Sequence, residues 1–247
     1  MSTLSSRAIL MIISLALWGL LGCGSDRHLK AKSAAEAAYL QGMDALESED
    51  FLTANERFNT LKTKYLFSPF AALAELRLGD SALAQGHTYE AIQTYQIFIQ
   101  TRPQHAEVPY AYWKIGESYA KDRPSDFFVL PPSFERDRNA TKDALRALKK
   151  YLELYPQHKN AKEAQALVNS CRRELASHEL YVARFYRDRK KWVAARGRYE
   201  LLLSRFPDTK SLWREGASEL IEVYQALKLD DRAKSLENKL KAQESSD

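Results

Sequence analysis

Small and bulky apolar residues recur along the chain at a spacing that is typical of paired helices. Gly79 is followed by Ala91 after twelve residues and by Pro103 after twelve more. Tyr95 lies four residues after Ala91, on the same face of a helix, where its ring can fill the space beside the small residue. Because proline lacks an N–H group, Pro103 should end the second helix. The pattern predicts two antiparallel helices that cross closely where their side chains are small.

The same spacing returns several times, which indicates an internal repeat. Gly42, Gly79 and Gly116 are 37 residues apart, and the later pair Ala183 and Ala195 is again separated by twelve residues. This is the tetratricopeptide spacing, in which one helical hairpin cannot bury its own apolar face and must stack on its neighbours. Alternating strand-like runs are nearly absent. The expected fold class is all-α, a tetratricopeptide-repeat superhelix of about five helix pairs.

The repeats divide the expected folded part into two groups. Repeats 1 and 2 occupy residues 34–110, and repeats 3 to 5 occupy residues 111–240. The stretch from 160 to 189 reads as one long helix or as two nearly merged helices. The fifth repeat is degenerate and charged, which suits a terminal repeat whose outer face meets water. Residues 241–247 form a polar tail.

The third repeat contains an insert between its two helices. Ala144 lies 28 residues after Gly116 instead of twelve, so about 16 residues, from 121 to 136, are added. The insert is rich in apolar residues, including three aromatic ones: Phe127, Phe128 and Phe134. A long apolar loop is costly to expose, and long loops in compact domains are often functional. We expect a docking element for a partner, with a flap packed on a neighbouring helix as the alternative.

The turn between the first two repeats is unusually aromatic. It contains Tyr65, Phe67 and Phe70 within six residues. Such a cluster either packs in the core between repeats or forms the lip of a groove that binds a peptide. The sequence leaves both interpretations open.

Residues 1–22 have the pattern of a secretory signal. Arg7 supplies the positive charge, and residues 8–21 form an apolar run of about 14 residues, which is short for a membrane span. The run ends in Leu-Leu-Gly-Cys at residues 20–23, which resembles a bacterial lipobox with Cys23 as the lipid-bearing residue. An ordinary secreted protein would need an Ala-x-Ala cleavage site, which is missing, and an uncleaved anchor would need a longer run.

Lipidation at Cys23 predicts a protein anchored in a bacterial membrane, because three acyl chains exceed the two signals that stable anchoring requires. The next residue is Gly24 and not aspartate, and by the sorting rule known for many Gram-negative lipoproteins this directs the protein to the outer membrane. Residues 23–33 are then a lipidated flexible tether. We expect a location on the periplasmic face of the outer membrane.

Composition and motifs argue against several other functions. The 37 basic and 32 acidic residues are interleaved, and no basic stripe with stacking aromatics suggests nucleic-acid binding. No Gly-rich phosphate loop, His-Glu-x-x-His or Cys-x-x-Cys motif occurs. The five histidines have no metal-ligand spacing, and Cys171, the only other cysteine, lies in a helical pattern as a core or boundary residue. The sequence therefore predicts a protein that is not an enzyme and needs no metal or cofactor.

The lipobox followed by these repeats resembles the BamD family, the tetratricopeptide lipoproteins of the outer-membrane β-barrel assembly machine. The most specific matches are in repeat four, where residues 181–186 read Tyr-Val-Ala-Arg-Phe-Tyr and residues 205–209 read Arg-Phe-Pro-Asp-Thr. The aromatic turn and the repeat-three insert also resemble the family. Leu66, Ser68 and the paired prolines of the insert depart from its pattern.

The resemblance implies a scaffold that binds other proteins. Its C-terminal repeats would hold the periplasmic POTRA domain of the insertase BamA through Arg198, Arg205 and Asp208. Its N-terminal repeats would receive unfolded barrel proteins in a groove lined by the aromatic turn, and other Bam lipoproteins are implied as partners. The alternatives are another tetratricopeptide outer-membrane adaptor, serving a secretin or a peptidoglycan enzyme, and an enzyme with a cryptic site.

Overall fold

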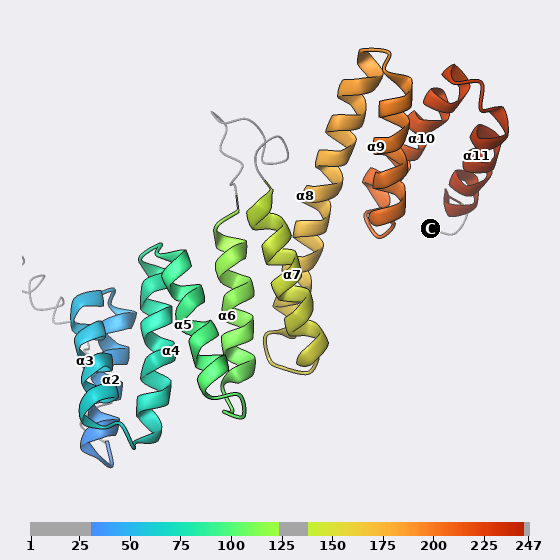
Figure 1. Cartoon of the computed structure of the whole chain (residues 1–247). Helices are drawn as coiled ribbons and strands as arrows, with labels where there is room; N and C mark the ends of the chain where they lie inside the picture. Colours follow the sequence, from blue (N-terminus) through green and yellow to red (C-terminus); the bar gives the residue numbers. More distant parts are fainter. Residues whose placement is uncertain (1–30, 124–137, 245–247) are drawn as a thin grey trace, which may run out of the picture. The chain divides into compact units, whose positions relative to one another are not determined.

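The computed structural model describes residues 31–123 and 138–244, and those two stretches contain ten α-helices and no strand (Figure 1). The all-α fold is confirmed. The helices are α2 (Ala34–Glu47), α3 (Phe51–Lys64), α4 (Pro69–Ala84), α5 (Thr88–Thr101), α6 (Val108–Lys121), α7 (Asn139–Leu154), α8 (Ala161–Asp188), α9 (Trp192–Arg205), α10 (Lys210–Ala226) and α11 (Asp230–Glu244).

The chain separates into two compact units, residues 1–86 and residues 87–247. Helices α2 to α4 belong to the first unit, and α5 to α11 belong to the second. Within each unit, helices that follow one another in the sequence pack side by side. This is the arrangement expected of stacked helical hairpins.

In the first unit, α2 and α3 form a hairpin whose ends are fixed by capping. At the start of α2 the Ser33 side chain accepts a hydrogen bond from the Glu36 N–H at 3.1 Å. At the start of α3 the Asp50 side chain accepts one from the Thr53 N–H, also at 3.1 Å. A Cβ atom on Gly42 would lie 2.6 Å from the Phe58 ring. Only glycine fits at this crossing, as the spacing predicted.

The small-to-bulky pattern has the same steric role in the second unit. A Cβ atom on Gly116 would lie 2.6 Å from Cδ2 of Leu148, so α6 and α7 also approach at a glycine. The bulky residue four positions after the small one is fully buried on four helices, as Phe58 of α3, Tyr95 of α5, Leu148 of α7 and Tyr199 of α9. The tetratricopeptide pattern therefore describes the core of both units.

Helix α8 is continuous over 28 residues, so the long-helix interpretation of residues 160 to 189 is confirmed. It packs against α7 before it and α9 after it. Cys171, near its middle, is fully buried, which confirms the predicted core position. Burial raises the pKa of the Cys171 thiol, because a thiolate would lose its hydration there.

Candidate functional site: a basic groove between α7, α8 and α9

A groove of about 510 Å³ lies between α7, α8 and α9 in the second unit. Its floor is apolar and consists of Leu145, Leu175, Leu201 and Phe206. Its charged lining has five cations, namely Arg138, Lys142, Arg172, Arg198 and Arg205, and one acid, Glu179. A surface of this kind suits a partner that brings carboxylates together with an apolar side chain. We call it the basic groove.

Arg198 is held in place and still accessible at this groove. Its Nη1 donates a hydrogen bond to Oε2 of Glu179 at 3.1 Å, which joins α9 to α8. The Arg198 side chain remains 42% exposed, whereas that of Glu179 is only 17% exposed. A guanidinium group has five N–H donors, so this arginine can bind a further carboxylate without releasing Glu179. Glu179 thus orients the side chain that the family resemblance singled out.

Arg205 and Asp208 have different roles in the structure. Arg205 lines the basic groove, and its side chain is exposed, while its backbone carbonyl accepts a hydrogen bond from Arg172 at 2.8 Å. Asp208 is outside the groove lining and accepts a hydrogen bond from Nε of Arg172 at 2.6 Å. This hydrogen bond holds the pKa of the Asp208 carboxyl below its usual value. Asp208 therefore helps to fasten the α9–α10 turn to α8.

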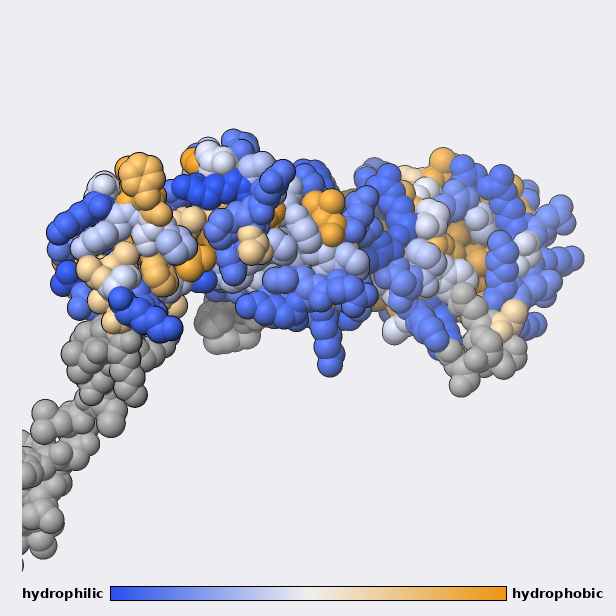
Figure 2. Space-filling model, turned by 90° about the horizontal axis from the view of Figure 1, so that it is seen from below, coloured by the Kyte–Doolittle hydropathy of each residue, from blue (hydrophilic) through white to orange (hydrophobic). Residues whose placement is uncertain are grey.

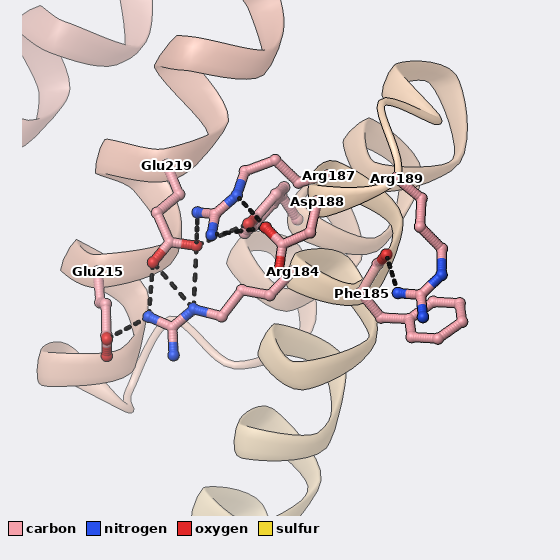
Figure 3. A network of polar contacts seen from close by, with 8 residues as sticks. Arg184, Phe185, Arg187, Asp188, Arg189, Glu215 and Glu219 are labelled. Carbon is pink, nitrogen blue, oxygen red and sulfur yellow. Dashed lines mark hydrogen bonds and ion pairs between the residues drawn. The ribbon is translucent and has the colours of Figure 1, made fainter.

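A polar network joins α8, α9 and α10 (Figure 3). Glu219 of α10 is its centre, with Oε1 3.0 Å from Nε of Arg184 and Oε2 2.7 Å from Nη1 of Arg187. The hydroxyl of Tyr199 donates a hydrogen bond to Oε2 at 2.6 Å. Burial alone would raise the pKa of Glu219, but the hydrogen bonds from Arg184 and Tyr199 outweigh it and lower the pKa.

Beside this network, an aromatic ring and a guanidinium are stacked at the end of α8. The guanidinium of Arg189 lies 3.6 Å from the centroid of the Phe185 ring and donates a hydrogen bond to the Phe185 carbonyl at 3.1 Å (Figure 3). Phe185 is 41% exposed. The stack keeps a partly exposed aromatic side chain in one orientation.

The aromatic turn of the first unit is divided between core and solvent. Tyr65 and Phe70 are half-buried and pack against the core of α2 to α4, with the Phe70 ring 5.4 Å from that of Tyr39. Phe67 is 96% exposed. The three residues are close in sequence, but only Phe67 presents its whole ring to a partner.

On the face shown in Figure 2, hydrophilic residues predominate and hydrophobic ones form small separate groups.

Several sequence predictions fall on residues that the structure does not describe. Cys23 lies outside the described residues, as do Phe127, Phe128 and Phe134 of the insert. Over the stretches 31–123 and 138–244, no helix is both long and apolar enough to cross a membrane. Within the same stretches, no group of three or more His, Cys, Asp or Glu side chains is arranged to hold a metal ion.

The stacked helical hairpins, with their glycine crossings and charged groove, define a tetratricopeptide-repeat protein. The chain belongs to the YfiO family of outer membrane lipoproteins, whose model matches residues 31–240. It is 29% identical over 220 residues to the outer membrane protein assembly factor BamD of Vibrio cholerae, covering 88% of this chain and 90% of that protein. The BamD protein of Haemophilus influenzae is 25% identical over 235 residues, covering 93% and 86%.

Proposed function

We propose that this chain is a non-enzymatic scaffold of the outer-membrane β-barrel assembly (Bam) complex. The proposal places it on the periplasmic face of the outer membrane, anchored by lipid on Cys23. Membership of the YfiO family and the similarity to BamD proteins support the assignment. The observation that carries it is the basic groove, where Arg198 is oriented by Glu179 and remains accessible.

In this proposal, the basic groove binds the POTRA domain of a BamA-type insertase. Arg198 and Arg205 point their charges at acidic residues of that domain, and the apolar floor receives a side chain between them. Asp208 contributes by fixing the turn through Arg172, which keeps Arg205 at the groove. An excess of one charge over an apolar floor favours fast association and a defined orientation of the partner.

The first unit is proposed to receive unfolded outer-membrane proteins. Because its ring is exposed, Phe67 is the residue proposed to contact the substrate. Tyr65 and Phe70 hold the turn in place through their packing on the core. An exposed ring on a fixed turn suits an aromatic strand segment of a substrate. The insert residues Phe127, Phe128 and Phe134 are proposed as a docking element for another member of the complex, such as one of its other lipoproteins.

The test is co-purification of the full-length lipidated protein from detergent-solubilised outer membranes. Wild type is compared with Arg198→Glu and with the control Arg173→Glu, which makes the same charge change at an exposed position of α8 outside the basic groove. We expect a POTRA-containing barrel protein with wild type and with Arg173→Glu, and at least tenfold less with Arg198→Glu. Reversal of this charge should lose at least about 1.4 kcal/mol of binding free energy, which is a factor of ten.

Two results contradict the proposal. If Arg198→Glu retains as much POTRA protein as wild type, Arg198 is not part of the contact. If a secretin or a peptidoglycan enzyme co-purifies and no POTRA protein does, the chain is an outer-membrane adaptor of another kind.

A further inference from the structure

The turn between α8 and α9 consists of three exposed cations in a row. Arg189, Lys190 and Lys191 connect the last residue of α8 to the first residue of α9, at the end of this hairpin (Figure 1). None of the three side chains is paired with a carboxylate of residues 31–123 or 138–244. We call these three residues the cationic turn.

The acids of α8 and α10 that lie beside the cationic turn are bound by other arginines (Figure 3). Asp188 is 3.1 Å from Nη2 of Arg187, and Glu219 is 2.7 Å from Nη1 of the same side chain. Glu215 is paired with Arg184. The charge of the cationic turn is therefore uncompensated by these groups and faces solvent.

The shape of the turn does not require cations. The middle residue of such a turn has a positive φ, which is 57° at Lys190, 61° at Glu49 and 80° at Gly86. The equivalent turn around Glu49 reads Ser-Glu-Asp, and the one around Gly86 reads Gln-Gly-His. The same backbone conformation thus accepts acidic, neutral and basic residues. The reason for three cations between α8 and α9 therefore lies in a contact that this surface makes.

Exposed apolar side chains flank the cationic turn on both helices. Phe185 of α8 is 41% exposed, and Val193 of α9 is 64% exposed. Phe185 lies three residues before the end of α8 and Val193 one residue after the start of α9, so at about 1.5 Å per residue both are within about 5 Å of the helix ends. The Arg189 guanidinium, 3.6 Å from the Phe185 ring centroid, holds this ring beside the charge and away from the Glu219 network (Figure 3). Trp192 packs on the core and fixes the turn from below.

This combination of charge and apolar surface fits the interface of an anionic phospholipid layer. Phosphate groups at such a surface attract lysine and arginine side chains. Apolar side chains a few ångströms behind the cations reach the boundary between headgroups and acyl chains, where interfacial elements are buried by about 5–10 Å. A lipid layer adapts to a protruding turn, whereas a protein partner would need an acidic hollow of matching shape with an apolar rim.

We propose that the cationic turn is a membrane contact that binds the headgroups of anionic phospholipids. Its three cations bind phosphate oxygens, while Phe185 and Val193 insert at the boundary with the acyl chains. Each cation close to an anionic surface contributes about fivefold to binding, so three contribute roughly 100-fold. The proposal goes beyond the scaffold function, because none of these residues lines the basic groove.

The experiment measures how closely the turn approaches lipid. The full-length lipidated protein is reconstituted into vesicles of phosphatidylcholine or of an equimolar mixture of phosphatidylcholine and phosphatidylglycerol. A fluorophore is attached to Val193→Cys, and spin-labelled lipids quench it on contact. The control label is on Leu52→Cys, because Leu52 is the second residue of α3, is 83% exposed and follows an acidic turn. Protein without an added cysteine shows how much label the buried Cys171 takes up.

We expect quenching at position 193 to be at least threefold stronger in the anionic vesicles than in the neutral ones, and quenching at position 52 to be no stronger. Lys190→Glu/Lys191→Glu reverses two charges of the turn and should abolish the difference at position 193. Lys149→Glu/Lys150→Glu makes the same changes at two adjacent exposed lysines of α7 and should preserve it. Circular dichroism shows whether each variant is folded.

Flotation of the vesicles separates this proposal from the proposed lipid anchor. Protein that floats with both vesicle types supports the anchor, and the label at position 193 then decides on the turn. If only the anionic vesicles carry the protein and Lys190→Glu/Lys191→Glu releases it, the anchor is contradicted and the membrane contact is supported. Protein that floats with neither contradicts both.

Three results of the quenching measurement overturn the membrane contact. Quenching at position 193 could be equal in the two vesicle types, the difference could survive Lys190→Glu/Lys191→Glu, or Lys149→Glu/Lys150→Glu could remove it as well. In each case the cationic turn does not bind phospholipid, and its charges are left to an acidic protein surface.

Discussion

Replacing Glu219 by glutamine should destabilise the second unit, because this one carboxylate is bonded to side chains of two other helices. Arg184 and Arg187 come from α8 and Tyr199 comes from α9, while Glu219 lies on α10 (Figure 3). Glutamine has nearly the same size, but it is neutral and offers one acceptor oxygen in place of two. The substitution therefore tests the charge and the hydrogen bonds without opening a cavity.

The size of the expected loss in unfolding free energy depends on how far the ion pairs of Glu219 are buried and on the hydrogen bond that glutamine can still accept. Removing one partner of a buried ion pair costs about 3–5 kcal/mol. The Glu219 side chain is 16% exposed, but that of Arg184 is 36% exposed, so solvent screens part of the interaction. Glutamine also keeps one acceptor. We expect a loss of about 2 kcal/mol in the free energy of unfolding, which corresponds to a fall of about 4–8 °C in Tm for a unit of this size.

The difference in stability between wild type and Glu219→Gln should become smaller as the pH falls. The pKa of Glu219 in the folded protein is below its ordinary value of 4.5. Its contribution to stability is therefore present above that value and is lost as the pH falls through the folded-state pKa. Glutamine does not titrate, so the difference in Tm between wild type and Glu219→Gln should shrink below pH 4.5.

Thermal unfolding, followed by circular dichroism at pH 7 and at pH 3.5, measures both the fall in Tm and its dependence on pH. Glu222→Gln is the matched control, since Glu222 is an exposed residue one turn away on α10. If Glu219→Gln and Glu222→Gln have the same Tm at pH 7, the network does not stabilise the unit. If the difference between wild type and Glu219→Gln persists unchanged at pH 3.5, its origin is not the carboxylate charge.

Two further predictions concern the packing of the second unit. Gly116→Ala should lower the free energy of unfolding by about 1–3 kcal/mol, because the added Cβ would lie 2.6 Å from the buried Leu148 side chain. At Gly197 an added Cβ meets nothing within 4 Å, so Gly197→Ala should raise the free energy of unfolding by up to about 1 kcal/mol. Denaturant titrations measure both, and equal effects of the two changes would contradict the close crossing. The buried Cys171 thiol should react with a thiol reagent at pH 8 only after denaturation, because its burial raises its pKa and blocks access. Rapid modification of the folded protein would show that α8 opens at its centre.

The aromatic turn shows where sequence reasoning stopped. Tyr65, Phe67 and Phe70 are all aromatic and lie within six residues of one another, so the sequence left open both a core role and a binding role. The structure packs Tyr65 and Phe70 on the core and leaves Phe67 exposed. The division depends on the direction in which the chain leaves α3 and enters α4, and no local pattern specifies that direction.

The sequence by itself determined the helical hairpins of this protein, because their formation depends on short-range sterics. A small residue followed twelve positions later by another, and four positions after that by a bulky side chain, specifies where two neighbouring helices cross, as Gly42 with Phe58 shows. Gly116 and Leu148 make the same close approach although the insert lengthens the first spacing to 28 residues. The tertiary structure alone decided which charges pair. Glu179 lies 19 residues from Arg198, and the Arg184–Glu219 pair spans 35 residues. Many carboxylates were equivalent in the sequence. The packing of separate helices selected Glu179 and Glu219, because an ion pair forms only between groups that the fold brings within a few ångströms.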